Sequence, residues 1–252
     1  ARNHGLRMRV HTLLWHSQTP NWVFQDENGQ PLTNSPAHQA LLLQRLQSHI
    51  ETVVTRYNDI VDAWDVVNEV IDASQPDGLR RSPWYNILGP GYIAKAFEYA
   101  AAVARPDALL CINDYSTTDA AKRAALYNVV QNLLSQGLKV DSVGHQMHIN
   151  IAWPPLADIR QTFELFAGLG VINEVTEMDM SAYTNNSDTS PVTEQTLIVQ
   201  GYRYRDIFNL YRELKDLISS VTLWGLADDN TWLKTFPITR DDKPLLFDED
   251  LQ

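Results

Sequence analysis

Short apolar runs alternate with segments of helical periodicity along the 252 residues, and this alternation is what most constrains the fold. Six of the nine residues from Ile60 to Asn68 are apolar and four of these are β-branched, as in a strand that is buried on both faces. The segment from Pro36 to Arg56 instead repeats Leu42, Leu46 and Ile50 at helical spacing. Buried strands separated by helices predict a parallel sheet wrapped by helices.

The rest of the chain continues this pattern. We expect strands at Leu6–Trp15, Ile60–Asn68, Ala108–Asn113, Val140–His148, Val171–Met178 and Val221–Leu226. We expect helices at Pro36–Arg56, Tyr92–Ala104, Ala120–Leu134, Leu156–Ala167 and Glu194–Leu217. Polar and aromatic residues gather at the carboxyl ends of these strands, which is typical of a (β/α)8-type TIM barrel. Six strands predict an incomplete barrel with about six βα units in one domain, 1–252, whose first and last strands are free edges open to self-association.

Composition narrows the class of ligand. The formal net charge is −11, from 31 acidic and 20 basic residues, which argues against nucleic acid and suits a neutral partner. No run is long enough to span a membrane, and no basic-then-apolar leader opens the chain. We interpret it as a mature or trimmed secreted chain, with a cytoplasmic protein as the alternative. The single cysteine, Cys111, sits in an apolar run and predicts an inert core thiol.

Two glutamates at strand ends are the candidates for chemistry. Glu69 follows the run that ends in Asn68, and Glu177 lies in the run from Val171. Two such carboxyl groups can act as the acid/base and the nucleophile of a retaining glycosidase. The plain alternatives are a solvated loop glutamate and a charge pair at a strand edge, and Glu174 competes with Glu177 for the nucleophile role. A metal site at His145 and His148 is a poor alternative, because a strand splays these side chains apart.

Six motifs in order resemble glycoside hydrolase family 10, the endo-β-1,4-xylanases. They are His11–Gln18, Trp64–Glu69, Ile112–Tyr115, Gly144–His148, Thr176–Met180, and Val221–Leu226 followed by Thr231–Trp232. The chain departs from the family pattern at Val10, where glycine is usual, and at Leu233, where arginine is common. The family's first two βα units, with a Glu-Asn pair and a lysine that bind sugar, have no counterpart in this sequence. The resemblance therefore implies weak binding on the non-reducing side.

The resemblance also implies roles for individual residues. Glu69 would be the acid/base, Glu177 the nucleophile, and Asn68 a donor to the sugar 2-hydroxyl. Further substrate contacts are expected at His11, Trp15, Asn113, Tyr115, Gln146, His148, Trp224 and Trp232. No cofactor or metal is expected, and the partner would be xylan or xylo-oligosaccharides, without nucleic acid or membrane. A related barrel glycosidase that acts on another β-1,4-glycan, and an inactive xylan-binding relative, remain alternatives.

Overall fold

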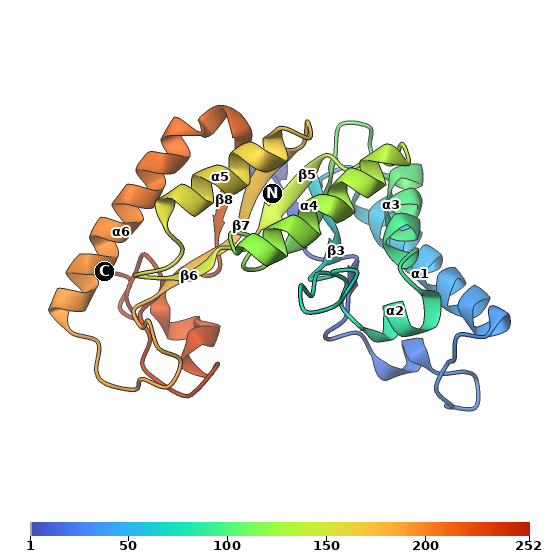
Figure 1. Ribbon diagram of the computed structural model, residues 1–252, viewed down its shortest axis with the longest axis horizontal. Helices are drawn as coiled ribbons and strands as arrows, with labels where there is room; N and C mark the ends of the chain where they lie inside the picture. The colour runs from blue at the N-terminus through green and yellow to red at the C-terminus, as the bar shows by residue number, and fades with distance from the viewer. Residues whose placement is uncertain (1) are drawn as a thin grey trace. The chain divides into compact units, whose positions relative to one another are not determined.

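The computed structural model describes residues 2–252, which form two compact units (Figure 1). Unit 1 comprises residues 2–114 and Ala124–Gly144, and unit 2 comprises Tyr115–Arg123 and His145–Gln252. Each unit contains parallel strands that alternate with helices, as the sequence predicts.

In unit 1, three strands pair in parallel with a buried strand between them. β3 (Ala63–Asn68) is buried over its whole length and pairs with β4 (Leu109–Asp114). On its other side it pairs with β1 (Arg9–Val10) and then β2 (Leu14–Trp15). The single strand predicted over Leu6–Trp15 is therefore wrong in detail, because the chain leaves the ladder between these two pieces.

Helices α1 (Pro36–Tyr57) and α3 (Tyr92–Val103) lie side by side in unit 1 (Figure 1). α1 begins at a signal that the sequence carries, with Pro36 in the first turn and the Ser35 hydroxyl accepting from the His38 amide. Its buried face is Leu42, Leu46, Ile50 and Val54. Truncation of one such leucine to alanine costs about 2–5 kcal/mol of folding free energy. This face is buried within unit 1, where α1 packs against α3.

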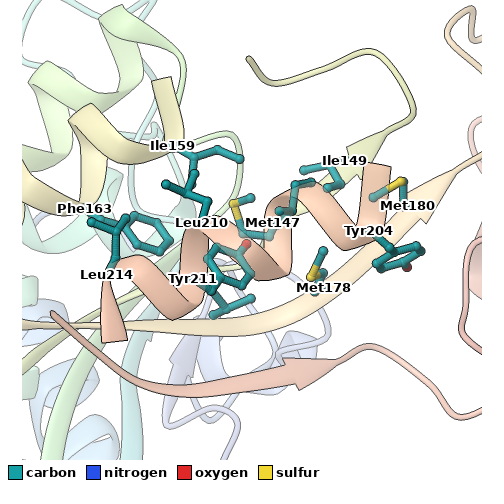
Figure 2. Close-up of a cluster of buried hydrophobic side chains, with 12 residues drawn as sticks. Met147, Ile149, Ile159, Phe163, Met178, Met180, Tyr204, Leu210, Tyr211 and Leu214 are labelled. Carbon is teal, nitrogen blue, oxygen red and sulfur yellow. The ribbon is translucent and has the colours of Figure 1, made fainter. Parts of the chain in front are cut away.

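In unit 2, a long strand pairs in parallel on both sides. β7 (Ile172–Ser181) pairs with β6 (His148–Asn150) and with β8 (Ile218–Leu223). Side chains from β6, β7, α5 (Leu156–Ala167) and α6 (Glu194–Glu213) build its apolar core (Figure 2). Phe163 and Ile207 are fully buried there. This packing fixes the backbone of β7 and thus the side chains that β7 presents.

Three predictions in the second half of the chain need correction. β5 (Ser142–His145) and β6 replace the single strand predicted over Val140–His148, because Met147 takes a left-handed φ of 60°. β7 runs three residues past the predicted Met178, because those residues pair with β6. β8 ends before Trp224, not at Leu226.

The remaining elements are short or were predicted closely. α4 (Ala120–Ser135) and α5 match their predicted ranges to within a residue. The last predicted helix divides into α6 and the 3-10 helix η3 (Lys215–Leu217). The prediction missed α2 (Pro83–Leu88), although Ser82 and Pro83 are a helix start signal. Other 3-10 turns are η1 (Arg2–His4), η2 (Asn21–Phe24), η4 (Asp228–Asn230) and η5 (Trp232–Lys234).

The outer strands of each unit have an open side. Among the described residues of unit 1, β1 and β2 pair only with β3; in the described part of unit 2, β8 pairs only with β7. Val221 on β8 is accordingly exposed. Self-association through such edges stays a prediction. In the described range 2–252, no helix is both long and apolar enough to cross a bilayer.

Candidate active site

Glu69 lies one residue beyond β3, on a strained backbone. Its φ of 57° falls in the left-handed region that side chains rarely adopt. Two hydrogen bonds hold it there: the Glu69 amide donates to the Asn113 carbonyl at 2.8 Å, and Arg80 Nε donates to the Glu69 carbonyl at 2.7 Å. Strain that the surroundings maintain in this way is common at functional sites. It turns the carboxyl group out of the strand, where His16 Nε2 lies 3.9 Å from Oε2.

Asn68 and Asn113 form a buried amide pair beneath Glu69. Asn113 Nδ2 donates to Asn68 Oδ1 at 2.9 Å, and both side chains are almost completely buried. The bond fixes the rotamer of Asn68 and links β4 to β3. Asn113 thus supports Asn68, and its predicted contact with sugar stays a prediction.

The other predicted residues of unit 1 follow β1 and end β2. His11 Nδ1 lies 3.0 Å from Asp65 Oδ2, and Arg9 also pairs with Asp65. Burial opposes ionisation of Asp65, but the Arg9 and His11 partners outweigh it and lower the pKa of this carboxyl. The His11 ring stands 6.0 Å from that of Trp15, whose carbonyl accepts from the Trp84 indole.

Glu177 lies inside β7 rather than at its end. Its amide donates to the Gln146 carbonyl at 3.0 Å, so the stretch between β5 and β6 pairs with β7 at this point. The side chain is 6% exposed. Asp179, two residues on, shares its face of the strand.

His148 bridges these two carboxylates. Its Nε2 lies 3.1 Å from Glu177 Oε2, and its Nδ1 lies 3.0 Å from Asp179 Oδ1. Burial on its own lowers the pKa of His148, but the hydrogen bonds to Asp179 and Glu177 outweigh it and raise the pKa to about 9. This raised pKa favours the imidazolium, in which both ring nitrogens donate to the carboxylates.

Two tryptophans flank this histidine. The Trp232 ring lies 5.1 Å and the Trp224 ring 6.3 Å from the His148 ring. Trp232 Nε1 also donates to Asp179 Oδ2 at 2.7 Å, so Asp179 orients a ring and a histidine together. Tyr115 also belongs to unit 2, and the Lys122 ammonium lies 3.0 Å from the centre of its ring.

Each unit thus gathers its own share of the predicted residues. Unit 1 brings Asn68, Glu69 and Asn113 together, and unit 2 brings Glu177, His148 and Trp232 together. His16, Arg80 and Asp179 contact these residues but were not among the predicted site residues. His16 follows Trp15 directly within the motif His11–Gln18, and Asp179 follows Glu177 at strand spacing. No feature of the sequence pointed to Arg80. Within residues 2–252, no group of three or more His, Cys, Asp or Glu residues is placed to hold a metal ion.

The profile of the family described as "Glycosyl hydrolase family 10" matches residues 1–252. The chain belongs to this family. An endo-1,4-beta-xylanase A of Halalkalibacterium halodurans is 49% identical over 247 residues, which are 92% of this chain and 61% of that protein.

Solved structures agree with this assignment. The crystal structure of xylanase B from Clostridium stercorarium F9 superposes with a TM-score of 0.95 at 43% identity, over 100% of this chain and 77% of that one. A structure in complex with xylotriose has a TM-score of 0.90 at 38% identity, over 100% of this chain and 76% of that one. The chain spans 66%, 61% and 36% of the lengths of three curated relatives. The (β/α)8-type fold class is confirmed, and so is the expectation that this chain carries only part of such a barrel.

Proposed function

We propose that this chain carries the catalytic centre of a retaining endo-β-1,4-xylanase, with Glu69 as the acid/base and Glu177 as the nucleophile. The observation that carries this assignment of roles is the contrast in how the two carboxyl groups are held. The charged His148 donates to Glu177, an interaction that an ionised carboxylate accepts. Glu69 instead lies near His16, with Nε2 at 3.9 Å, and keeps 17% of its side chain exposed, against 6% for Glu177.

The reaction follows from these roles. Glu69 protonates the oxygen of the leaving sugar while Glu177 attacks the anomeric carbon, and the glycosidic C–O bond breaks as the ester bond to Glu177 forms. Glu69, now anionic, then takes a proton from water, whose oxygen attacks the same carbon and releases Glu177. Such a pair of carboxyl groups works at a separation of about 5–5.5 Å.

The surrounding residues bind the sugar in this proposal. Asn68, fixed by Asn113, donates to the 2-hydroxyl, an interaction that strengthens as positive charge develops on the ring. Trp224 and Trp232 offer aromatic faces to the apolar C–H faces of the sugar, and His148 orients Glu177. Further substrate contacts are proposed for His11, Trp15, Asn113, Tyr115 and Gln146.

The name of the Halalkalibacterium relative and the xylotriose complex of a structural neighbour support xylan and its oligosaccharides as the substrate class. A panel of β-1,4-xylan, glucan and mannan tests that choice, and we expect release of reducing ends from xylan far above the others. Proton NMR of the first products tests the stereochemistry. The β-anomer is expected first, and the α-anomer first would rule out retention.

A further inference from the structure

A short hairpin, residues 70–80, follows Glu69 directly in the chain. Ile71 and Leu79 pair in it as an antiparallel bridge. Arg80 ends the hairpin, and its Nε reaches back to accept no partner but to donate to the Glu69 carbonyl at 2.7 Å. The position of the 70–80 hairpin therefore sets where Arg80 holds the backbone of Glu69.

Two contacts fix this hairpin to the rest of unit 1. At its start, the Ile71 amide donates at 3.0 Å to Asp114 Oδ2, at the end of β4. Near its tip, Gly78 lies so close to α4 that a Cβ added to it would stand 2.8 Å from the Cβ of Ala125. Because carbon atoms pack at about 3.5–4.0 Å, the hairpin would have to shift to admit a larger residue at position 78.

The backbone of Gly78 carries a cost of its own for other residues. Its φ of 73° lies in the left-handed region, which favours glycine. Gly137, just after α4, has nearly the same φ of 76°, but beyond its chain neighbours no described residue lies within 4 Å of the place of an added Cβ. Comparison of the two glycines therefore separates the contact with α4 from the cost of the backbone conformation.

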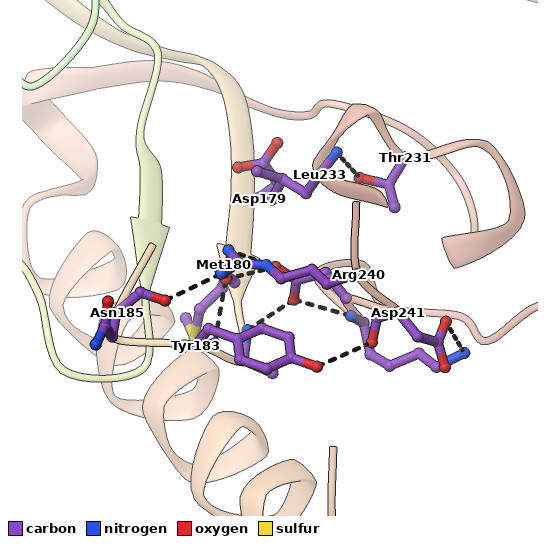
Figure 3. A network of polar contacts seen from close by, with 12 residues as sticks. Asp179, Met180, Tyr183, Asn185, Thr231, Leu233, Arg240 and Asp241 are labelled. Carbon is purple, nitrogen blue, oxygen red and sulfur yellow. Dashed lines mark hydrogen bonds and ion pairs between the residues drawn. The ribbon is translucent and has the colours of Figure 1, made fainter. Parts of the chain in front are cut away.

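Unit 2 also uses an arginine to hold the segment after its carboxyl-bearing strand. Arg240 donates to the Asn185 carbonyl at 3.1 Å (Figure 3). Asn185 lies eight positions beyond Glu177, whereas the bond from Arg80 ends on the carbonyl of Glu69 itself. A shift of the 70–80 hairpin would thus act directly on a residue that the proposed reaction uses.

We propose that Gly78 is a positioning residue for proton transfer by Glu69. Its close approach to Ala125 seats the 70–80 hairpin against α4, the hairpin places Arg80, and Arg80 maintains the left-handed turn that directs the carboxyl group. This inference rests on the proposed function for the role of Glu69. It goes further in giving a part in that role to a glycine nine positions along the chain.

Rates on xylan and on an aryl xylobioside with a good leaving group test the proposal. A displaced acid slows the departure of a sugar but not of a group that needs little protonation. We expect Gly78→Ala to lower kcat/KM on xylan by about 3- to 10-fold and to change it on the aryl substrate by less than about twofold. Gly137→Ala is the matched control and should leave both rates near wild type. Equal losses on the two substrates in Gly78→Ala would mean that this glycine serves only the fold, and would overturn the proposal.

Substitutions on α4 test the same contact from its other side. Ala125→Gly removes the carbon that a Cβ at position 78 meets, so it should restore most of the lost rate when combined with Gly78→Ala. Ala125→Val instead adds bulk beside the hairpin without changing the hairpin itself, and it decides the question if Gly78→Ala does not fold. We expect a loss confined to xylan from Ala125→Val and none from Ala124→Val, at the exposed neighbouring position. A double variant without recovery, or two valine variants that behave alike, would refute the proposal.

An NMR measurement separates this inference from the proposed function. The Arg80 Nε–H signal, assigned with Arg80→Lys, reports the bond to the Glu69 carbonyl. We expect this hydrogen to exchange with water faster in Gly78→Ala than in the wild type or in Gly137→Ala. Unchanged exchange, in a protein whose Glu69→Ala variant shows the loss confined to xylan, refutes the positioning role and leaves the proposed function intact. If Glu69→Ala loses both substrates equally, the acid/base assignment fails, and this inference fails with it.

Discussion

The surroundings of Glu69 and of Glu177 show two ways to hold a carboxyl group. Glu69 stands on a left-handed backbone after β3, and backbone bonds to Asn113 and Arg80 maintain that turn. Glu177 stands within a regular, buried strand, and the charged His148 fixes its side chain. Distant hydrogen bonds thus constrain the backbone at Glu69, and a histidine constrains the carboxylate of Glu177. A nucleophile that must remain an anion suits a place beside a charged histidine, as proposed for Glu177.

The largest expected effect comes from removal of the Glu177 carboxylate. Glu177→Ala deletes the attacking oxygen, so we expect kcat on xylan to fall by about 10⁴-fold or more. Substrates with good leaving groups would lose as much, because the missing bond is the one to carbon. Steady-state rates on xylan and on an aryl xylobioside measure this. Activity of this variant within tenfold of wild type would remove Glu177 from the mechanism.

Removal of the Glu69 carboxyl group is expected to show a different pattern. Glu69→Ala removes the proton donor, so we expect a loss of about 10²–10⁴-fold on xylan. An aryl xylobioside with a good leaving group needs little protonation and would still form the intermediate. Azide would then release it as the β-glycosyl azide, which chromatography and NMR identify. Identical behaviour of the two variants on the aryl substrate would erase the contrast.

The stabilisation from His148 and its two carboxylate partners depends on pH. The pKa of His148 is raised to about 9 in the folded protein, against 6.5 for an unperturbed histidine. Its contribution to the free energy of unfolding, about 3 kcal/mol from that difference, is complete below pH 6.5 and is lost as the pH rises through 9. Urea titrations between pH 6 and 10 measure this loss. Asp179→Asn, which removes one carboxylate partner, should flatten the slope; an unchanged slope would contradict the assignment.

His145, three residues away, is expected to act in the opposite direction. Burial lowers its pKa to about 4, and it lies neutral against Phe163, with ring centres 4.6 Å apart. The unfolded chain takes up a proton below pH 6.5 and the folded one does not, so about 3 kcal/mol is lost as the pH falls from 6.5 to 4. His145→Gln should lessen this acid slope, whereas His49→Gln, at an exposed position of α1, should not. Urea titrations of the three proteins between pH 4 and 7 make the comparison.

How far the sequence predicted these surroundings depends on the range of the interactions. The apolar runs and cap residues that define α1, α5 and β3 are local, so those elements were predicted within a few residues. The left-handed turns at Glu69 and Met147 were not predicted, because neither is glycine and bonds from distant strands maintain them. The contact of Trp232 with Asp179 spans 53 positions, and no periodicity reports such a pairing.

The smallest expected effect tests the constrained backbone at Glu69. Arg80 Nε holds the Glu69 carbonyl at 2.7 Å, and a lysine in its place keeps the charge but loses the planar fork that makes this bond. We expect Arg80→Lys to lower kcat on xylan by about tenfold with little change in KM, because a loosened acid/base affects proton transfer more than binding. Arg81→Lys, next in the chain and paired with Asp77 on the surface, is the matched control. The decisive readout is the leaving-group dependence: the Arg80 variant should be slow on xylan and nearly normal on the aryl xylobioside. A uniform loss on both substrates would mean that Arg80 only stabilises the fold, and the strained turn would then have no part in placing the acid.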